Sequence, residues 1–277
     1  CKMFIRDSWG MYRNILETVE VVKKFEEELK NLQAVTQSTN AELGSMSNTI
    51  KAVGKGLGVE ITEIAKGMVK LGQAGLTVAE ASGAIKDVVT LAVATMTDID
   101  VASDLVTTGM RAWGLQATDT AHIVDVLSNT VNNSKVTING LSTALQYLTG
   151  VAPQVNMSFQ ETSAVIGVLA NQGIKMSKIG TGLRSLLGEL LKPSKKFKDE
   201  LHKVGLTLED MDVKTRGIIP ILEDLAKSGF DATSAFKGMG RRSASAISAL
   251  IKNGKSVGEF SESLGKICGN NPRIHSL

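Results

Sequence analysis

A short pattern recurs along this chain. It consists of a turn residue, an apolar residue and usually a residue with a hydroxyl side chain, followed three positions after that third residue by an acidic residue. The copies lie at residues 75–80 (GLTVAE), 114–119 (GLQATD), 156–161 (NMSFQE) and, more weakly, 205–210 (GLTLED). Thr77 with Glu80, and Ser158 with Glu161, have the spacing of capping boxes, in which hydroxyl and carboxylate each satisfy a helix N–H. The leading glycine, or Asn156, suits the left-handed position that ends a helix. The pattern therefore predicts a succession of capped helices.

The spacing of these copies predicts how the helices are grouped. Apolar residues at helical spacing fill the intervals, and a second helix is expected in each, for instance over 100–113 and 137–149. The copies recur about every 40 residues, which favours an array of stacked helical hairpins. Capping signals are common to all helical proteins. The alternative to a structural repeat is therefore that the four copies recur by chance.

Composition supports a helical chain. Aromatic residues make up 4% of the sequence, and only four of its 277 residues are proline. Ala, Val, Ile, Leu and Met supply most of the apolar residues, which suits helix packing better than a β-sandwich. The predicted fold class is all-α, an array of stacked helical hairpins with a long N-terminal amphipathic helix.

The N-terminal helix is predicted from about Met11 to Gln37. Apolar residues recur there at three- and four-residue steps, at Ile15, Val19, Val22, Leu29 and Leu32. We interpret this helix as an exposed arm that needs a partner, and we expect a flexible hinge after it at Gly54, Gly56 and Gly58. The predicted organisation is an N-terminal arm and Gly-rich hinge (1–56), core helices (57–192) and a C-terminal helical segment (193–277).

Charge is distributed unevenly although the net charge is only +3. Residues 75–135 contain seven acids and three bases, and residues 175–216 contain ten bases and six acids. Such a distribution could promote head-to-tail self-association, and solvated helix faces are the alternative. The longest apolar run, Val88–Met96, is about half of what a membrane-spanning helix needs, and no signal peptide is readable at the start.

A search for catalytic, metal or nucleotide motifs finds only weak candidates. His122, His202 and His275 are far apart, and Cys1 and Cys268 form no ligand spacing. Gly254-Lys255-Ser256 resembles the end of a P-loop but lacks its first glycine. Further partial matches are Ser234 with Lys237, Ser263 with Lys266, and Glu262 before Ser263. We therefore predict no enzyme, no cofactor, and no catalytic, cofactor-binding or metal-binding residue. The basic run 192–203 has one aromatic residue, Phe197, and no nucleic-acid module, so sequence-specific nucleic-acid binding is not expected.

From about Leu57 to Lys255 the sequence resembles the core region of bacteriophage tail tape measure proteins. The stretches that carry the resemblance keep the family's order: 65–77 (AKGMVKLGQAGLT), 108–115 (TGMRAWGL), Ala152-Pro153, and 165–186 (VIGVLANQGIKMSKIGTGLRSL), closed by 191–194 (LKPS). The resemblance implies a structural protein of the virion tail that lies in the tube lumen, templates tube assembly and tail length, and leaves ahead of the DNA. It also implies that the protein is present in the host bacterial cytoplasm during assembly.

The same resemblance implies partners: the tail tube protein, tail tip or baseplate proteins, a tail assembly chaperone, and further copies of the chain as a homo-oligomer. The sequence departs from a complete tape measure because it has no long ruler helix. A cell-wall-degrading module, a membrane-active ejection module and a general helical adaptor are the alternatives.

Overall fold

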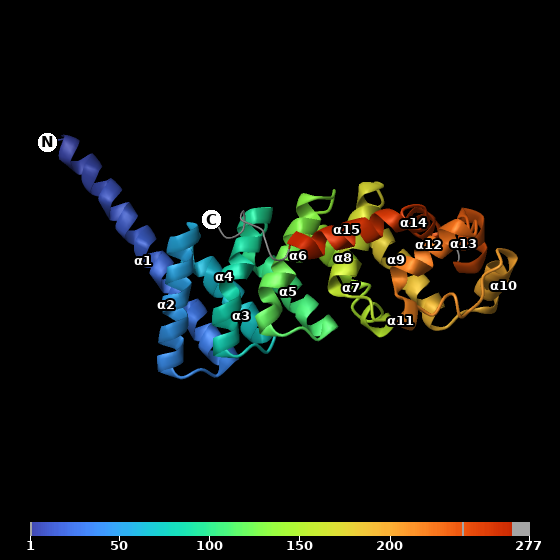
Figure 1. Cartoon of the computed structure of the whole chain (residues 1–277). Helices are drawn as coiled ribbons and strands as arrows, with labels where there is room; N and C mark the ends of the chain where they lie inside the picture. The colour runs from blue at the N-terminus through green and yellow to red at the C-terminus, as the bar shows by residue number, and fades with distance from the viewer. Residues whose placement is uncertain (1, 240, 268–277) are drawn as a thin grey trace.

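The computed structural model describes residues 2–239 and 241–267, and these residues form helices and turns without a strand (Figure 1). The predicted all-α class is confirmed. Fifteen α-helices and two 3₁₀ turns follow in this order: α1 (Lys2–Thr36), α2 (Asn40–Leu57), α3 (Ile61–Gln73), α4 (Val78–Thr95), α5 (Ile99–Trp113), η1 (Ala117–Asp119), α6 (Thr120–Asn132), α7 (Ile138–Gln146), η2 (Pro153–Val155), α8 (Phe159–Asn171), α9 (Met176–Leu191), α10 (Lys195–Lys203), α11 (Val213–Arg216), α12 (Ile218–Lys227), α13 (Ala232–Met239), α14 (Arg241–Lys252) and α15 (Gly254–Ile267).

The predicted capping boxes are present at the starts of α4 and α8. In α4 the Thr77 hydroxyl accepts a hydrogen bond from the Glu80 N–H at 3.3 Å, and the Glu80 carboxylate accepts the Thr77 N–H at 2.8 Å. Ser158 and Glu161 pair in the same way at the start of α8. Because the first N–H groups of a helix have no partner within the helix, each box fixes where its helix begins.

The turns before these helices have the predicted left-handed backbone. Gly75, Gly114 and Asn156 have φ values of 88°, 67° and 57°. One capping box was not predicted: Thr39 and Glu42 form it at the start of α2, with the Thr39 N–H 2.8 Å from the Glu42 carboxylate. The capping pattern thus begins one interval earlier than the sequence analysis placed it.

The fourth copy of the pattern does not begin a helix. The Asp210 carboxylate accepts the Thr207 N–H at 2.8 Å, as a capping box requires. The chain then turns again, because Asp212 accepts the Lys214 N–H at 3.1 Å and starts α11 instead. The box here closes a turn between α10 and α11.

The predicted Gly-rich hinge is wrong. Gly54 and Gly56 lie inside α2, and Gly58, with a φ of 67°, ends that helix. A Cβ added at Gly54 would lie 2.9 Å from the carbonyl oxygen of Val59 and 3.0 Å from Cγ2 of Ile61. Gly54 is therefore needed for the close return of the chain into α3, and it serves packing, not flexibility.

The helices from α2 to α9 lie in two layers. Helices α2, α4, α6 and α8 contact one another in that order, and α3, α5, α7 and α9 form the second series. Helices that follow each other in sequence also pack across the layers, as α3 does with α4 and α4 with α5. The core between them is aliphatic, with Leu71, Val88, Leu105, Leu127 and Leu145 no more than 1% exposed. The predicted array of stacked hairpins stays an interpretation of these contacts.

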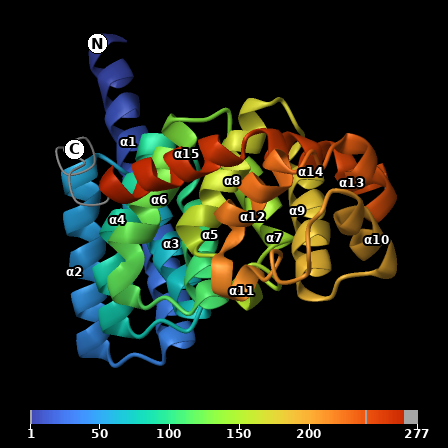
Figure 2. The same ribbon diagram turned by 45° about the vertical axis from the view of Figure 1, so that its right-hand side comes forward.

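The C-terminal helices return over the array. Helix α14 packs along α9, and α15 packs against α8 and α6, so the chain reverses its direction (Figure 2). The Gln160 amide donates to the carbonyl of Ser261 at 2.6 Å. A Cβ at Gly167 would lie 2.7 Å from the Phe260 ring. These contacts join segments about 100 residues apart and add a third set of helices that packs against α6, α8 and α9.

Helix α1 is docked over its C-terminal half. It packs along α3, where Leu32 is fully buried and Phe25 is 5% exposed. Farther toward the N-terminus the helix extends away from the other helices (Figure 1), and Val19 and Val22 are 45% and 48% exposed. The exposed arm is therefore shorter than predicted, because Leu32 belongs to the core.

Two glycines of α9 provide a test of close packing. A Cβ at Gly180 would lie 2.6 Å from Cδ2 of Tyr147 and 2.9 Å from the carbonyl oxygen of Ala144, whereas nothing lies within 4 Å of one at Gly188. We expect Gly180→Ala to lower the free energy of unfolding by about 1–3 kcal/mol through overpacking against α7. Gly188→Ala should raise it by roughly 0.5–1 kcal/mol because alanine is the better helix former. Urea unfolding followed by circular dichroism measures both, and equal effects would contradict the α7–α9 contact.

Candidate functional site

Among the described residues, the histidines and the weak motifs do not converge on a site. His122 is exposed on α6, whereas Asp125, one turn later, is buried, and His202 is exposed on α10. In the part of the chain that the structure describes, no three His, Cys, Asp or Glu residues are grouped so that they could hold a metal ion. The prediction of no catalytic, cofactor or metal residue stays a prediction.

The other weak matches lie on helices. Gly254-Lys255-Ser256 begins α15 directly after α14, so a helix stands where a P-loop needs a strand. The Ser234 N–H donates to Asp231 at 2.9 Å near the start of α13, and Glu262 is exposed on α15. His275, Cys1 and Cys268 lie outside the described residues.

A polar hollow of about 630 Å³ lies on the second layer of helices. Among the residues that line this hollow, the Lys70 ammonium of α3 lies 3.8 Å from the Asp104 carboxylate of α5. The Arg111 guanidinium of α5 donates to the carbonyls of Ala74 and Gln73 at 3.1 and 3.2 Å, which satisfies the C-terminal end of α3. Helix α7 adds uncharged side chains: Asn139, Ser142, Thr143 and Gln146. Such amide and hydroxyl groups are suited to hydrogen bonding with a partner's main chain.

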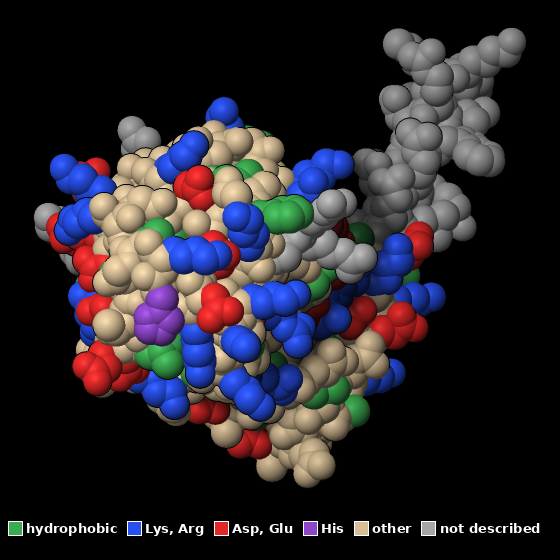
Figure 3. All heavy atoms as spheres, turned by 90° about the vertical axis from the view of Figure 1, so that its right-hand side faces the viewer, with side chains coloured by type: hydrophobic (Ala, Val, Ile, Leu, Met, Phe, Trp, Pro, Cys, Tyr) green, Lys and Arg blue, Asp and Glu red, His purple; other side chains and the backbone are tan. Residues whose placement is uncertain are grey.

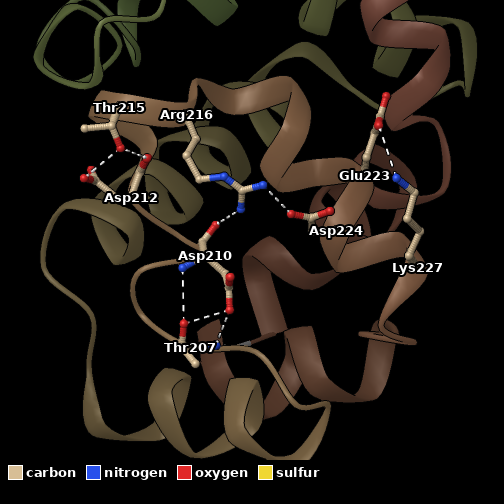
Figure 4. Close-up of polar contacts among 8 residues, drawn as sticks. All are labelled: Thr207, Asp210, Asp212, Thr215, Arg216, Glu223, Asp224 and Lys227. Carbon is tan, nitrogen blue, oxygen red and sulfur yellow. Dashed lines mark hydrogen bonds and ion pairs between the residues drawn. The ribbon is translucent and has the colours of Figure 1, made fainter.

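Arg216 holds the segment between α10 and α12 (Figure 4). Its guanidinium donates to the carbonyl of Asp210 at 2.5 Å and pairs with the Asp224 carboxylate at 2.7 Å. Both side chains of the ion pair are about one-third exposed. The Asp210 carboxylate accepts the backbone N–H and the hydroxyl of Thr207, and these bonds, with a smaller contribution from Arg216, lower the pKa of Asp210.

The end of the molecule formed by α9, α10 and α13 is basic. Figure 3 shows lysine and arginine side chains gathered on this side. A cleft of about 500 Å³ is lined there by Lys196 and Lys237 with Phe236, Ser194 and Glu189. The Glu189 carboxylate accepts the Ser194 N–H at 2.7 Å, just before α10. The sequence analysis found the excess of bases in 175–216 but could not show that Lys237, from a later helix, lies beside it.

The described residues contain no helix that is long and apolar enough to cross a membrane. The fold is that of an all-α protein whose surface carries a polar hollow and a basic end. Residues 47–252 match the family of phage-related minor tail proteins, and the chain belongs to this family. That match runs from α2 to α14, so it includes both helix layers.

Curated relatives give the more particular likeness. The chain is 30% identical over 210 residues, or 76% of its length, to the tape measure protein of Pneumococcus phage Dp-1, of which it covers 18%. It is 29% identical over 207 residues, or 74% of its length, to a probable tape measure protein of Escherichia phage P2, of which it covers 25%. The chain thus spans a quarter or less of these relatives. No solved structure matches it.

Two ion pairs of Figure 4 test the role of Arg216. We expect Arg216→Met to lower the free energy of unfolding by about 1–2 kcal/mol, because it removes a bond to a backbone carbonyl and leaves Asp224 without its partner. Lys227 pairs with Glu223 at 3.5 Å and is 73% exposed, so Lys227→Met should change stability by less than about 0.5 kcal/mol. Urea midpoints of the two variants give the comparison, and similar values would show that the Arg216 bonds do not matter for stability.

The capping boxes predict an acid dependence of stability. Hydrogen bonds from the backbone and hydroxyl of Thr77 lower the pKa of Glu80 from its ordinary value of 4.5. A lowered pKa in the folded state adds stability that is complete above pH 4.5 and is lost as the pH falls through the folded value. We expect Glu80→Gln to lower the free energy of unfolding at pH 7. Between pH 7 and pH 3 the free energy of unfolding of this variant should fall by less than that of the parent. Urea unfolding at both pH values would contradict this if the two proteins lost equal stability.

Proposed function

We propose that this chain is the folded core segment of a phage tail tape measure protein. The observation that carries the proposal is the ordered match of residues 47–252 to the minor tail family, together with 30% identity to a protein named as a tape measure. The segment would lie in the tail tube lumen, where it would help to template tube assembly and would leave ahead of the DNA.

The partners follow from this position and are part of the proposal. They are the tail tube protein, tail tip or baseplate proteins, a tail assembly chaperone and further copies of the chain. The polar hollow lined by Lys70, Asp104 and Arg111 supports a binding role. It offers hydrogen-bonding groups from the adjacent helices α3, α5 and α7. We also propose that the segment acts by binding, without catalysis, which agrees with the names of its relatives.

The fold bears on how such a segment would relate to tail length. A single extended helix advances about 1.5 Å per residue, so 40 residues span roughly 60 Å. A hairpin of the same length that packs beside its neighbour advances the array by only about 10 Å, the distance between packed helices. We therefore propose that this segment nucleates or organises tube assembly, and that length is measured by extended helix elsewhere in the protein.

In-frame deletion of residues 47–252 from the gene of the phage or prophage that carries this chain tests the proposal. We expect few or no tails by electron microscopy, because the segment organises assembly. Leu208, which is 40% exposed, supplies a control, since Leu208→Ser should leave tails normal.

The other outcomes of the deletion are distinct. Phage with tails of normal length and with normal infectivity would contradict the proposed function. Tails shorter by roughly 300 Å, at 1.5 Å for each deleted residue, would show that the segment is an extended ruler and not a folded array.

A further inference from the structure

The turn after α4 presents a methionine to solvent. Met96 is 98% exposed and has a φ of 52°, in the left-handed region. Among the described residues, seven glycines have a positive φ next to the end of a helix, at Gly58, Gly75, Gly114, Gly173, Gly205, Gly217 and Gly229, and the non-glycine residues with a positive φ are Gln37, Met96 and Asn156. Glycine adopts this backbone more easily than methionine, and exposure of the thioether gives no burial energy. Folding alone therefore does not explain a methionine here.

Met96 projects into solvent beside a shallow hollow that has acidic residues in its lining. Val93, which is 38% exposed, lines this hollow of about 250 Å³ together with Met96, and Asp98 and Glu63 lie on its edge. Neither lysine nor arginine lines this hollow. Glu63 is paired with Lys66 at 2.7 Å, so Asp98, which is exposed, supplies the negative charge. We call the surface of Val93, Met96 and Asp98 the Met96 knob.

An apolar socket lies near the other end of the chain, between the α8–α9 turn, α13 and α14. It has a volume of about 650 Å³, and its apolar lining consists of Ile174, Ala232, Phe236, Ala244 and Ala249. Lys252 lies on its edge. The cleft that contains Lys196 and Lys237 shares Phe236 with it, on the basic end of the molecule (Figure 3). We call this surface the Phe236 socket.

We propose that the Met96 knob of one copy of this chain docks into the Phe236 socket of a second copy. Polarity matches, since a flexible thioether can pack against the apolar part of the socket lining. Charge matches too, because Asp98 of the knob would face Lys252, which lines the socket. Helix α4 lies toward the α1 end of the molecule and α13 at the opposite end (Figure 1), so knob and socket of the same copy do not meet.

A contact between two different surfaces of identical chains is heterologous, so it builds either a closed ring or an open row of copies. This is a specific prediction about assembly, and it stands on the two surfaces without requiring the tape measure role. A chain that failed to measure or organise tails could still associate in this way, and the reverse is also true.

Sedimentation velocity of the purified chain, over a range of concentrations and at low and high salt, tests the contact. The parent should associate and should dissociate at high salt, because the acidic and basic edges are exposed. Met96→Gly should weaken association at least tenfold while unfolding at an equal or higher urea concentration, since glycine relieves the left-handed backbone. Leu208→Ser, at another exposed apolar residue, is the matched control and should associate like the parent.

Two further variants make the test independent of Met96. Ser248→Trp should fill the socket and abolish association, and Lys252→Glu should weaken it. The Asp98→Lys variant by itself should also associate weakly. When it is mixed with the Lys252→Glu variant, the two proteins should associate with each other, because each charge again faces its opposite. A parent that stays monomeric at all concentrations would overturn the proposal. So would association that Met96→Gly and Ser248→Trp leave unchanged.

Discussion

The fold depends on how the chain satisfies the polar groups at its many helix ends. Each helix leaves N–H groups at its start and carbonyl groups at its end without partners, and short helices multiply this cost. Thr39, Thr77 and Ser158 satisfy the starts with capping boxes. Arg111 does the same for the end of α3 from a neighbouring helix. Once these ends are fixed, the apolar faces of successive helices are set in register and bury a continuous aliphatic core.

Close contacts between distant segments then hold the array together. Gly167 receives the Phe260 ring, and Gly180 lies against Tyr147, so adjacent helices approach more closely than larger side chains would allow. The return of α14 and α15 over α8 and α9 joins the end of the chain to its middle. A segment folded in this way presents surfaces at fixed positions, which suits an organising role in assembly better than measurement by an extended helix.

Much of this fold was predictable from sequence because capping and turn formation are local. The pattern Gly-Leu-Thr with Glu80 fixed the start of α4, and Asn156 marked the turn before α8. The function of Gly54 was not predictable, since it depends on the position of Val59 and Ile61 after folding. The polar hollow escaped sequence reasoning for the same reason: Lys70, Asp104 and Gln146 are far apart in the chain. Exposed residues such as Met96 give no periodic signal at all.

We propose that this segment acts in the phage tail as a folded array of helices. Gln160 on α8 and Ser261 on α15 are in contact only when the chain returns over itself. Cysteines at these two positions, with Cys1 and Cys268 replaced by serine, can be treated with a short bismaleimide in purified tails. If the segment is folded in the tail, an intramolecular cross-link should form between residues 160 and 261 in the assembled tail. Its absence from tails, together with its formation in the purified chain, would show that the segment is extended in the tail and would contradict the account.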